Sequence, residues 1–460
     1  MPNSLAYLAL IAWPAVSAVF FARMTPGRAL ITSLVVGYLL LPPQPAGIDL
    51  PLLPPLTKET IPSLAALVLA LIHAPQRTSL VPEGRVGRVL VAVFVLSPVV
   101  TALTNSEPVG WGTFHLPGLG LRDMLAMIVQ QSILIMPFLL GRALLAEADS
   151  QRDILMAFFV GGLVYSLPML VEIRLSPQIN IWVYGYFQHV FEQMMRGDGF
   201  RPLVFLYHGL WAAFFAMTSV VAAVALARAE TSRRSVALWG AALYLFAVLV
   251  LCKSLASLLY AVALVPLVAV AGAKIQIRLA ALLACLAIAY PVLKGTQLVP
   301  EDRLLAAARA VDDDRAASLE FRFAQERILL ERAEMKPLFG WGSWGRNHEH
   351  DSRTGAILTV TDGRWVILIG IHGWIGFLAE FGLLALPILT LARRSWGADP
   401  DQLPPFTAPL VLLLGINLAD LIPNATITPL TWMMAGAVLG FAERWQPARR
   451  SVLSPVRTVL

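Results

Sequence analysis

The segment from Phe339 to Leu383 contains the side chains with the chemistry of a proton acceptor. It starts as a polar stretch rich in Gly, Trp and His and runs directly into an apolar region. Asp362, His348 and His350 could each take a proton from a hydroxyl group, as a general base does. Imidazole has an ordinary pKa of about 6.5, whereas the Asp carboxyl has one of about 3.9 and is a weak base unless burial raises it. We therefore expect general-base chemistry here.

Each of these residues also has a structural interpretation. The tripeptide TDG around Asp362 is a common way to open a helix, with the Asp as N-cap. The run HEHD, which contains His348 and His350, fits an exposed polar loop, and its spacing also invites a metal site. A closed metal site needs about four ligands, and the sequence arranges none elsewhere. We expect no metal and no cofactor.

Basic residues in polar connections could bind an anion beside this base. The planar guanidinium of arginine grips phosphate oxygens with two donors, and lysine binds them as a point charge. Charged groups at membrane depth usually serve function, although they can also extend to lipid phosphates. The residues we select on this basis are Arg201, Arg322, Lys253 and Arg364.

Three further side chains are possible members of the same site. His208 stands beside Gly209 at the start of an apolar run, where a hydrogen-bonded structural role competes with a catalytic one. Trp341 and Trp344, in the run GWGSWG, could be platforms for sugar rings or anchors at the membrane interface. The run lacks the Gly-Lys-Ser/Thr ending of a nucleotide-binding loop.

The elements that must position these residues are membrane helices. Hydrophobic residues make up 57% of the 460-residue chain and charged residues only 14%, whereas soluble domains carry about 25% charge. The pattern predicts an all-α polytopic membrane protein with about 12–13 transmembrane helices. The predicted spans are 4–22, 29–42, 60–73, 89–104, 123–141, 153–173, 203–227, 236–252, 254–272, 279–293, 366–390, 404–422 and 427–442. A straight helix from 366 would place His372 about 15 Å along the axis from Asp362.

Basic residues cluster in alternate short connections, which predicts the orientation. The basic set includes Arg23 and Arg28, Arg393 and Arg394, and the C-terminal arginines. The positive-inside rule places this set in the cytoplasm, so the N-terminus is outside and the C-terminus inside. Orientation also explains the net charge of +6, which therefore does not indicate nucleic acid.

Three regions follow from this topology. Residues 1–293 form an N-terminal bundle with ten spans, and residues 366–460 form the last helices and a cytoplasmic tail. Residues 294–365 form a long loop outside the membrane, in which we expect two amphipathic helices on the outer face of the bundle.

In this layout the chain resembles the O-antigen ligase and polymerase superfamily, the membrane glycosyltransferases of bacterial surface polysaccharides. RAEMKPLFGWGSWG is similar to a family signature that precedes the catalytic helix, and Arg322 stands where the family has an Arg upstream of it. GFRPLVFLYHGLWAAFF and CKSLASLLYAVAL resemble two further outer-loop patterns, the second with Lys253 in place of an Arg. One piece departs: Gly373 and Gly376 keep the family spacing, which places Asp362-Gly363 where His-Asn is expected.

The resemblance implies a substrate and a place. The donor would be a glycan on undecaprenyl pyrophosphate, passed to a hydroxyl of a lipid or glycan acceptor at the periplasmic face of the bacterial inner membrane. The partners would be that donor, the acceptor, membrane lipids and other polysaccharide-assembly proteins, with no nucleic acid. Polymerase is favoured over ligase. The alternative is a transporter or flippase of lipid-linked glycans, for which internal inverted repeats and charges deep in several spans are expected.

Overall fold

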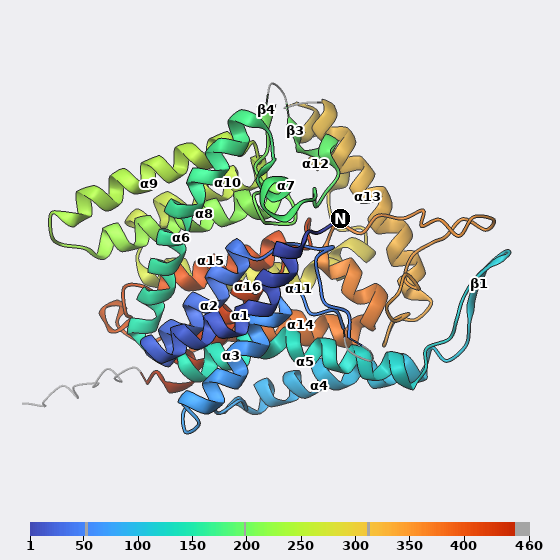
Figure 1. Ribbon diagram of the computed structural model, residues 1–460, viewed down its shortest axis with the longest axis horizontal. Helices are drawn as coiled ribbons and strands as arrows, with labels where there is room; N and C mark the ends of the chain where they lie inside the picture. The colour runs from blue at the N-terminus through green and yellow to red at the C-terminus, as the bar shows by residue number, and fades with distance from the viewer. Residues whose placement is uncertain (51–53, 197–198, 311–312, 447–460) are drawn as a thin grey trace, which may run out of the picture.

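The computed structural model describes residues 1–50, 54–196, 199–310 and 313–446, and these residues form an all-α polytopic membrane protein (Figure 1). Within these described ranges, eight helices are long and apolar enough to cross a membrane: α1 (Ser4–Arg23), α4 (Arg85–Leu103), α5 (Leu121–Leu144), α6 (Ala148–Leu175), α8 (Gly209–Ala229), α9 (Arg234–Leu251), α11 (Ala273–Gly295) and α14 (Arg364–Ser395). Shorter apolar helices are α2 (Pro26–Leu40), α3 (Thr60–His73), α10 (Leu255–Val270) and α15 (Thr407–Asp420), and α16 (Pro429–Arg444) is the last of the bundle.

The predicted fold class is confirmed, and every predicted span overlaps one of these helices, although α8 begins at Gly209 and not at position 203. Among its described residues, the loop predicted at 294–365 contains the two helices α12 (Glu301–Arg309) and α13 (Asp313–Glu334), and it ends where α14 begins at Arg364. Smaller elements lie in other connections: β1 (Val109–Trp111), β2 (Phe114–Leu116), α7 (Ile179–Tyr184), η1 (Phe191–Met194), β3 (Met195–Arg196), β4 (Gly199–Phe200) and η2 (Pro400–Gln402).

Contacts between connections define two faces of the bundle. On one face Asn3 N–H donates to Tyr184 O at 2.9 Å, and Lys58 Nζ donates to Phe205 O at 2.6 Å. This face also carries the 294–363 segment, and we call it the loop face. On the opposite face Arg142 pairs with Glu443 at 2.8 Å. Alternate connections along the sequence therefore lie together on one face of the bundle, which is the alternation that the orientation prediction uses.

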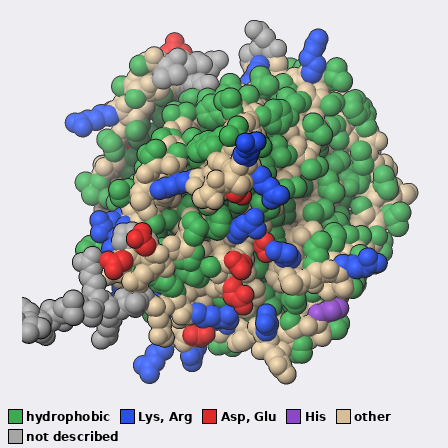
Figure 2. All heavy atoms as spheres, turned by 90° about the vertical axis from the view of Figure 1, so that its left-hand side faces the viewer, with side chains coloured by type: hydrophobic (Ala, Val, Ile, Leu, Met, Phe, Trp, Pro, Cys, Tyr) green, Lys and Arg blue, Asp and Glu red, His purple; other side chains and the backbone are tan. Residues whose placement is uncertain are grey.

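The opposite face is shown in Figure 2, where basic and acidic side chains gather in a central area beside a surface of hydrophobic side chains. The exposed pair Arg28–Asp153, at 2.8 Å, and the buried pair Arg142–Glu443 come from the helix ends there. Charged groups at the helix ends and apolar groups along the sides are the distribution that a membrane-spanning bundle requires.

Helix α14 is broken, which the sequence pattern did not predict. Gly373 has φ 66° and ψ −171°, a combination essentially restricted to glycine. A Cβ on Gly376 would lie 2.2 Å from the Cβ of His372, so the two arms approach closely just after the turn. The expected straight helix, with His372 far down its axis, is therefore wrong. Helix α14 therefore consists of a short arm before Gly373 and a long arm after it.

The segment 337–342 satisfies the backbone groups that the break exposes. Trp341 N–H donates to Gly370 O at 2.8 Å and Gly342 N–H donates to Ile371 O at 2.9 Å. On the other side of the break, the N–H groups of residues 374 and 375 donate to the carbonyls of Pro337 and Leu338. Irregular backbone at membrane depth is tolerated where protein groups pair with it in this way. The glycine-rich run is thus a structural insert in the bundle.

Candidate functional site

Arg322 and Asp362, which are 40 positions apart in the sequence, form an ion pair on the loop face. Nε of Arg322 lies 3.2 Å from Oδ2 of Asp362, and the side chains are 31% and 38% exposed. The chain before Asp362 runs along α13, because Val360 N–H donates to Gln325 Oε1 at 2.8 Å. A predicted phosphate-binding cation and a predicted base are therefore direct neighbours, both accessible from outside.

His208 lies close to this pair. It is 9% exposed and caps α8, with its Nδ1 accepting the N–H of Leu210 at 3.0 Å. Burial, followed by the nearby basic groups His189, Arg201, Arg196 and Arg322, lowers the pKa of His208 to about 3. The imidazole is therefore neutral at physiological pH. Because Nδ1 is an acceptor, Nε2 carries the proton and acts as a donor.

Arg201 and Lys253 join two connections beside His208. The guanidinium of Arg201 donates to the backbone oxygen of Lys253 through Nε at 3.2 Å and Nη2 at 3.1 Å. Lys253 Nζ in turn donates to Arg196 O at 2.8 Å, so the turn between α9 and α10 is bound to the β3–β4 hairpin. Arg201, Lys253, His208, Arg322 and Asp362 are thus gathered in one region of the loop face, which we call the basic site.

Arg364, which was also predicted to bind phosphate, pairs with a carboxylate inside the protein. Its Nε and Nη2 donate to the two carboxylate oxygens of Glu380 at 2.7 and 2.6 Å, and the side chain of Glu380 is fully buried. Its backbone N–H bonds to the carbonyls of Leu421 and Asn424, at the loop-face end of α15. The Arg364 guanidinium therefore has a bidentate carboxylate partner inside the protein.

The connection between α2 and α3 contains two further ionisable residues, Lys58 and Glu59, of which Lys58 is buried. Lys58 is 1% exposed, and its Nζ lies 5.5 Å from the Tyr38 ring centroid and 5.8 Å from that of Tyr207. Burial lowers the pKa of Lys58 to about 7, with Glu59 opposing the shift. Burial raises the pKa of Glu59, and Lys58 and Arg364 oppose that shift. The bond from Lys58 Nζ to Phe205 O ties this connection to the segment that precedes α8.

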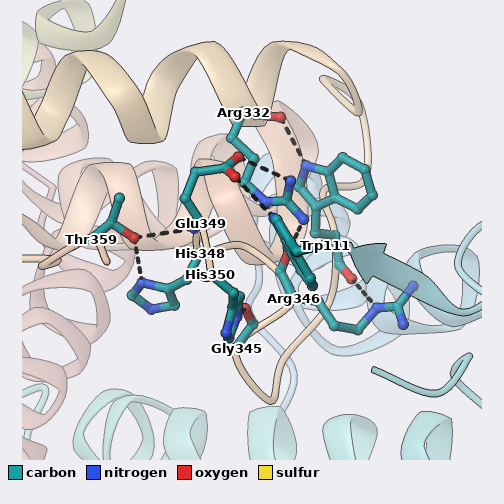
Figure 3. A network of polar contacts seen from close by, with 9 residues as sticks. Trp111, Arg332, Gly345, Arg346, His348, Glu349, His350 and Thr359 are labelled. Atoms are coloured by element: carbon teal, nitrogen blue, oxygen red, sulfur yellow. Dashed lines mark hydrogen bonds and ion pairs between the residues drawn. The ribbon is translucent and has the colours of Figure 1, made fainter. Parts of the chain in front are cut away.

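His350 is held in a second cluster (Figure 3). Its Nδ1 lies 3.1 Å from Gly355 O and its Nε2 lies 2.9 Å from Gly345 O. The ring packs against Trp111 and Phe114, with centroid distances of 4.4 and 5.2 Å. Both ring nitrogens face carbonyl oxygens, which only accept hydrogen bonds. In this arrangement both ring nitrogens of His350 face backbone carbonyls and neither faces a substrate hydroxyl.

Arg332 is the centre of that second cluster. Its guanidinium lies 4.6 Å from the Trp111 ring centroid and 4.3 Å from that of Trp341, and it contacts Glu349 at 3.1 Å. Arg346, 1% exposed, donates to the carbonyls of residues 341, 107 and 117 and so ties the glycine-rich run to the β1–β2 connection. Sequence reasoning did not select either arginine.

The aromatic residues of the glycine-rich run have different environments. Trp341 is 7% exposed, its ring is covered by Arg332 and Lys336, and its Nε1 donates to Arg332 O. Trp344 is 54% exposed and has φ 61°. Of the two, only Trp344 has a ring that a ligand can reach. The hypothesis of a platform for sugar rings therefore applies to Trp344 and not to Trp341.

The two clusters lie apart along α13. Arg322 and Arg332 are ten residues apart on this helix, which corresponds to about 15 Å along its axis. His348 belongs to the Arg332 end, because its Nδ1 bonds to Thr359 Oγ1 at 2.9 Å and the next residue, Glu349, pairs with Arg332. Burial lowers the pKa of His348. Of the three predicted bases, Asp362 alone lies in the basic site.

Two buried carboxylates that sequence reasoning did not select support the site. Asp420, 2% exposed, accepts from Thr426 Oγ1 at 2.6 Å and Asn424 Nδ2 at 2.9 Å. Glu172, 1% exposed, accepts the N–H groups of Leu203 and Val204, each at 2.7 Å, next to Arg201. Each is a carboxylate within an apolar run, which was the available signal.

Among the described residues, no group of three or more His, Cys, Asp or Glu side chains is placed to hold a metal ion. The basic site places cationic side chains, which can bind an anion, beside the accessible carboxylate of Asp362. A scan against protein-family models and a search of curated proteins found no match to the chain.

Proposed function

We propose that the protein is a membrane glycosyltransferase that moves or polymerises oligosaccharide units carried on undecaprenyl pyrophosphate. The single observation that carries the proposal is the meeting of Arg322 with Asp362 beside His208 and Arg201. A cationic site binds the pyrophosphate, and a carboxylate at its edge serves the acceptor hydroxyl. The resemblance in the sequence names this substrate class, and the grouping of these residues supports it.

In the proposed reaction the acceptor hydroxyl attacks the anomeric carbon of the donor glycan. The bond from that carbon to the pyrophosphate oxygen breaks, and the electron pair leaves with the pyrophosphate. Fixed cations stabilise the charge that develops there, a role for Arg201, Arg322 and Lys253. Asp362 accepts the hydroxyl proton. Its Oδ2 pairs with Arg322, so we assign Oδ1 to the acceptor.

The location follows from the orientation. With the basic short connections in the cytoplasm, the loop face is periplasmic, the N-terminus is periplasmic and the C-terminus is cytoplasmic. The membrane is then the bacterial inner membrane, where the loop face meets the outer leaflet. We favour a polymerase over a ligase, with other polysaccharide-assembly proteins as partners.

A second candidate function is transport of a lipid-linked glycan. The break at Gly373 and the buried pair Arg364–Glu380 favour it, because discontinuous helices and internal charges occur in transporters. Against it, the exposed cations of the site gather at one face.

The test uses purified protein in lipid nanodiscs with an undecaprenyl-pyrophosphate-linked oligosaccharide. A polymerase extends the glycan and releases undecaprenyl pyrophosphate, and both products are measured by mass spectrometry. Deleting the gene should correspondingly shorten the surface polysaccharide of the cell. If the substrate stays intact but crosses the bilayer of proteoliposomes, the transport function is correct and the transferase proposal is wrong.

A further inference from the structure

The basic site contains a pair of imidazoles that sequence reasoning did not recognise as a unit. The ring centroids of His189 and His208 are 4.6 Å apart, with 65° between the ring planes. His208 caps α8, and His189 precedes η1 in the connection that also contains the β3–β4 hairpin. The pair is therefore built by two parts of one loop-face connection, residues 176–208.

Both rings accept a backbone N–H at the same ring position. Val190 N–H donates to Nδ1 of His189 at 2.7 Å, and Leu210 N–H donates to Nδ1 of His208 at 3.0 Å. A nitrogen that accepts an N–H carries no proton, so a neutral ring with this contact has its proton on Nε2. Each ring then offers one Nε2–H donor. Protonation of Nδ1 would set two N–H groups against each other.

Among the described residues, the groups that act electrostatically on His208 are basic side chains. Burial first, and then His189, Arg201, Arg196 and Arg322, lower the pKa of His208 to about 3. Lys253 adds a further cation through its contact with Arg196. A ligand that fits among these groups is an anion with several acceptor oxygens. Phosphate oxygens accept from neutral N–H donors as well as from guanidinium groups.

We propose that His189 and His208 are a neutral donor pair that binds phosphate oxygens of a pyrophosphate through their Nε2–H groups. The inference rests on the proposed function for the identity of the natural ligand. His208 is then a ligand of the leaving group and not the base of the reaction. Neutral donors add hydrogen bonds without adding charge to a site that already holds several cations.

Two substitutions of each histidine distinguish three roles of the side chain: hydrogen-bond donor to the ligand, general base, and cap of the following backbone. Asparagine keeps an acceptor near the position of Nδ1 and is a good N-cap, but it has no group at the position of Nε2. Glutamine places an amide N–H near the position of Nε2 and cannot exchange a proton as a base does. A donor role predicts that the Gln variants work and the Asn variants do not. A base role predicts that both fail, and a cap role predicts that Asn is silent.

The experiment measures inorganic pyrophosphate binding to the detergent-purified protein by calorimetry. His208→Asn and His189→Asn should each weaken binding roughly 10- to 100-fold, the range for a lost hydrogen bond to a charged group. The dissociation constants of His208→Gln and His189→Gln for pyrophosphate should stay within about threefold of the parent value, which is a small difference in binding free energy. Thermal unfolding of all four variants shows whether each is folded. The matched control is His73→Asn. His73 is exposed and lies at the C-terminal end of α3, away from the loop face.

The outcomes separate this inference from the proposed function. If Arg322→Ala weakens binding and the Asn variants do not, the inference is wrong and the proposed function stands. If the Asn variants alone lose binding but the parent protein transfers no glycan, the donor pair is correct and the proposed function is wrong. If the Asn and Gln variants of His208 both bind normally and are both inactive, His208 is the base and the inference is overturned. A parent protein that binds no pyrophosphate also overturns it.

Discussion

Arg364 and Glu380 form a bidentate pair, with Nε–Oε1 and Nη2–Oε2 distances of 2.7 and 2.6 Å, although they are sixteen positions apart on what the sequence presents as one helix. In a continuous α-helix sixteen residues span about 24 Å. The pair therefore requires the turn at Gly373, and it connects the short arm of α14 to the long arm. Ion pair and helix break are two parts of one arrangement.

The first prediction concerns this pair. Glu380→Met should reduce stability by about 3–5 kcal/mol, because it leaves the Arg364 charge uncompensated inside the protein. The double variant Arg364→Met with Glu380→Met should recover much of that loss, since apolar replacements of a buried pair are often neutral. Thermal unfolding in detergent measures both. A double variant as unstable as the single one would contradict the assignment.

The same double variant tests the predicted phosphate role of Arg364. If Arg364 only connects the two arms of α14, the folded double variant keeps pyrophosphate binding. If Arg364 also reaches the substrate, the double variant is folded but binds weakly. The calorimetric titration with pyrophosphate distinguishes these two results.

The second prediction concerns the glycines of the break. Gly373→Ala should prevent correct folding, because a Cβ would lie 2.3 Å from the carbonyl group of Leu338 and the backbone has φ 66°. Gly376→Ala should fail as well, since its Cβ would meet that of His372. Gly240→Ala in α9 is the control: nothing lies within 4 Å of its Cβ, and it should stabilise the helix by about 0.5–1 kcal/mol. Yield of monodisperse protein after size-exclusion chromatography is the measurement.

The third prediction concerns Arg322 and Asp362. Both are partly exposed, so losing their ion pair should change stability by less than about 1 kcal/mol. Arg322→Ala should nevertheless abolish glycan transfer, and Arg322→Lys should restore it only in part, because lysine lacks the planar fork. Asp362→Asn should lower the rate roughly 100- to 10,000-fold if Asp362 is the base.

Arg309→Ala is the matched control for Arg322. Arg309 lies in the same loop and pairs with Glu320 at 3.5 Å, and both side chains are largely exposed. It should leave transfer unchanged. Equal effects of the two substitutions would attribute the loss to the loop and not to the site. If the Asp362→Asn variant is active, Asp362 is not the base, and His348 becomes the candidate for that role.

The positions of the membrane helices could be predicted from sequence because apolar length alone determines them. The break in α14 could not, because glycines within an apolar helical pattern cost only about 1 kcal/mol each and do not require a turn. What produces the turn is tertiary: the insertion of residues 337–342 and the pairing of Arg364 with Glu380. Neither contact can be read from the local pattern.

The candidate site could be predicted in part. Arg201, Arg322 and Asp362 were selected with the help of a family resemblance, and the structure brings them into one region. His350 was selected for its ordinary chemistry, but the carbonyls around it depend on how the loop folds back on itself. Glu172 and Asp420 could have been selected, because single carboxylates in apolar runs need a partner.

The fourth prediction concerns the histidines of the second cluster. His350→Ala should lower stability, because the ring fills the space between Trp111 and Phe114 and bonds to two carbonyls. The protein that remains folded should transfer glycan at the parent rate per molecule. Activity normalised to folded protein is the decisive quantity. A folded but inactive His350→Ala variant would return His350 to the list of catalytic groups.

The fifth prediction concerns acid stability. His208 has a pKa of about 3 in the folded protein and one of about 6.5 when unfolded. Between these values the unfolded chain binds a proton that the folded protein does not, so stability rises with pH there. The contribution of the neutral ring is fully present above about pH 6.5 and is lost on acidification, at up to about 1.4 kcal/mol per pH unit.

His208→Asn isolates this effect, because asparagine keeps the cap and does not titrate. The apparent melting temperature of the parent should fall further between pH 7 and pH 5 than that of the variant. All other titratable groups are common to the two proteins, so the difference between their pH slopes belongs to His208. Parallel slopes would mean that the folded and unfolded proteins bind the His208 proton equally, so that folding does not lower the pKa of this ring. The ring would then take up a proton in the folded protein on acidification, which would contradict a ring held neutral with Nδ1 as an acceptor.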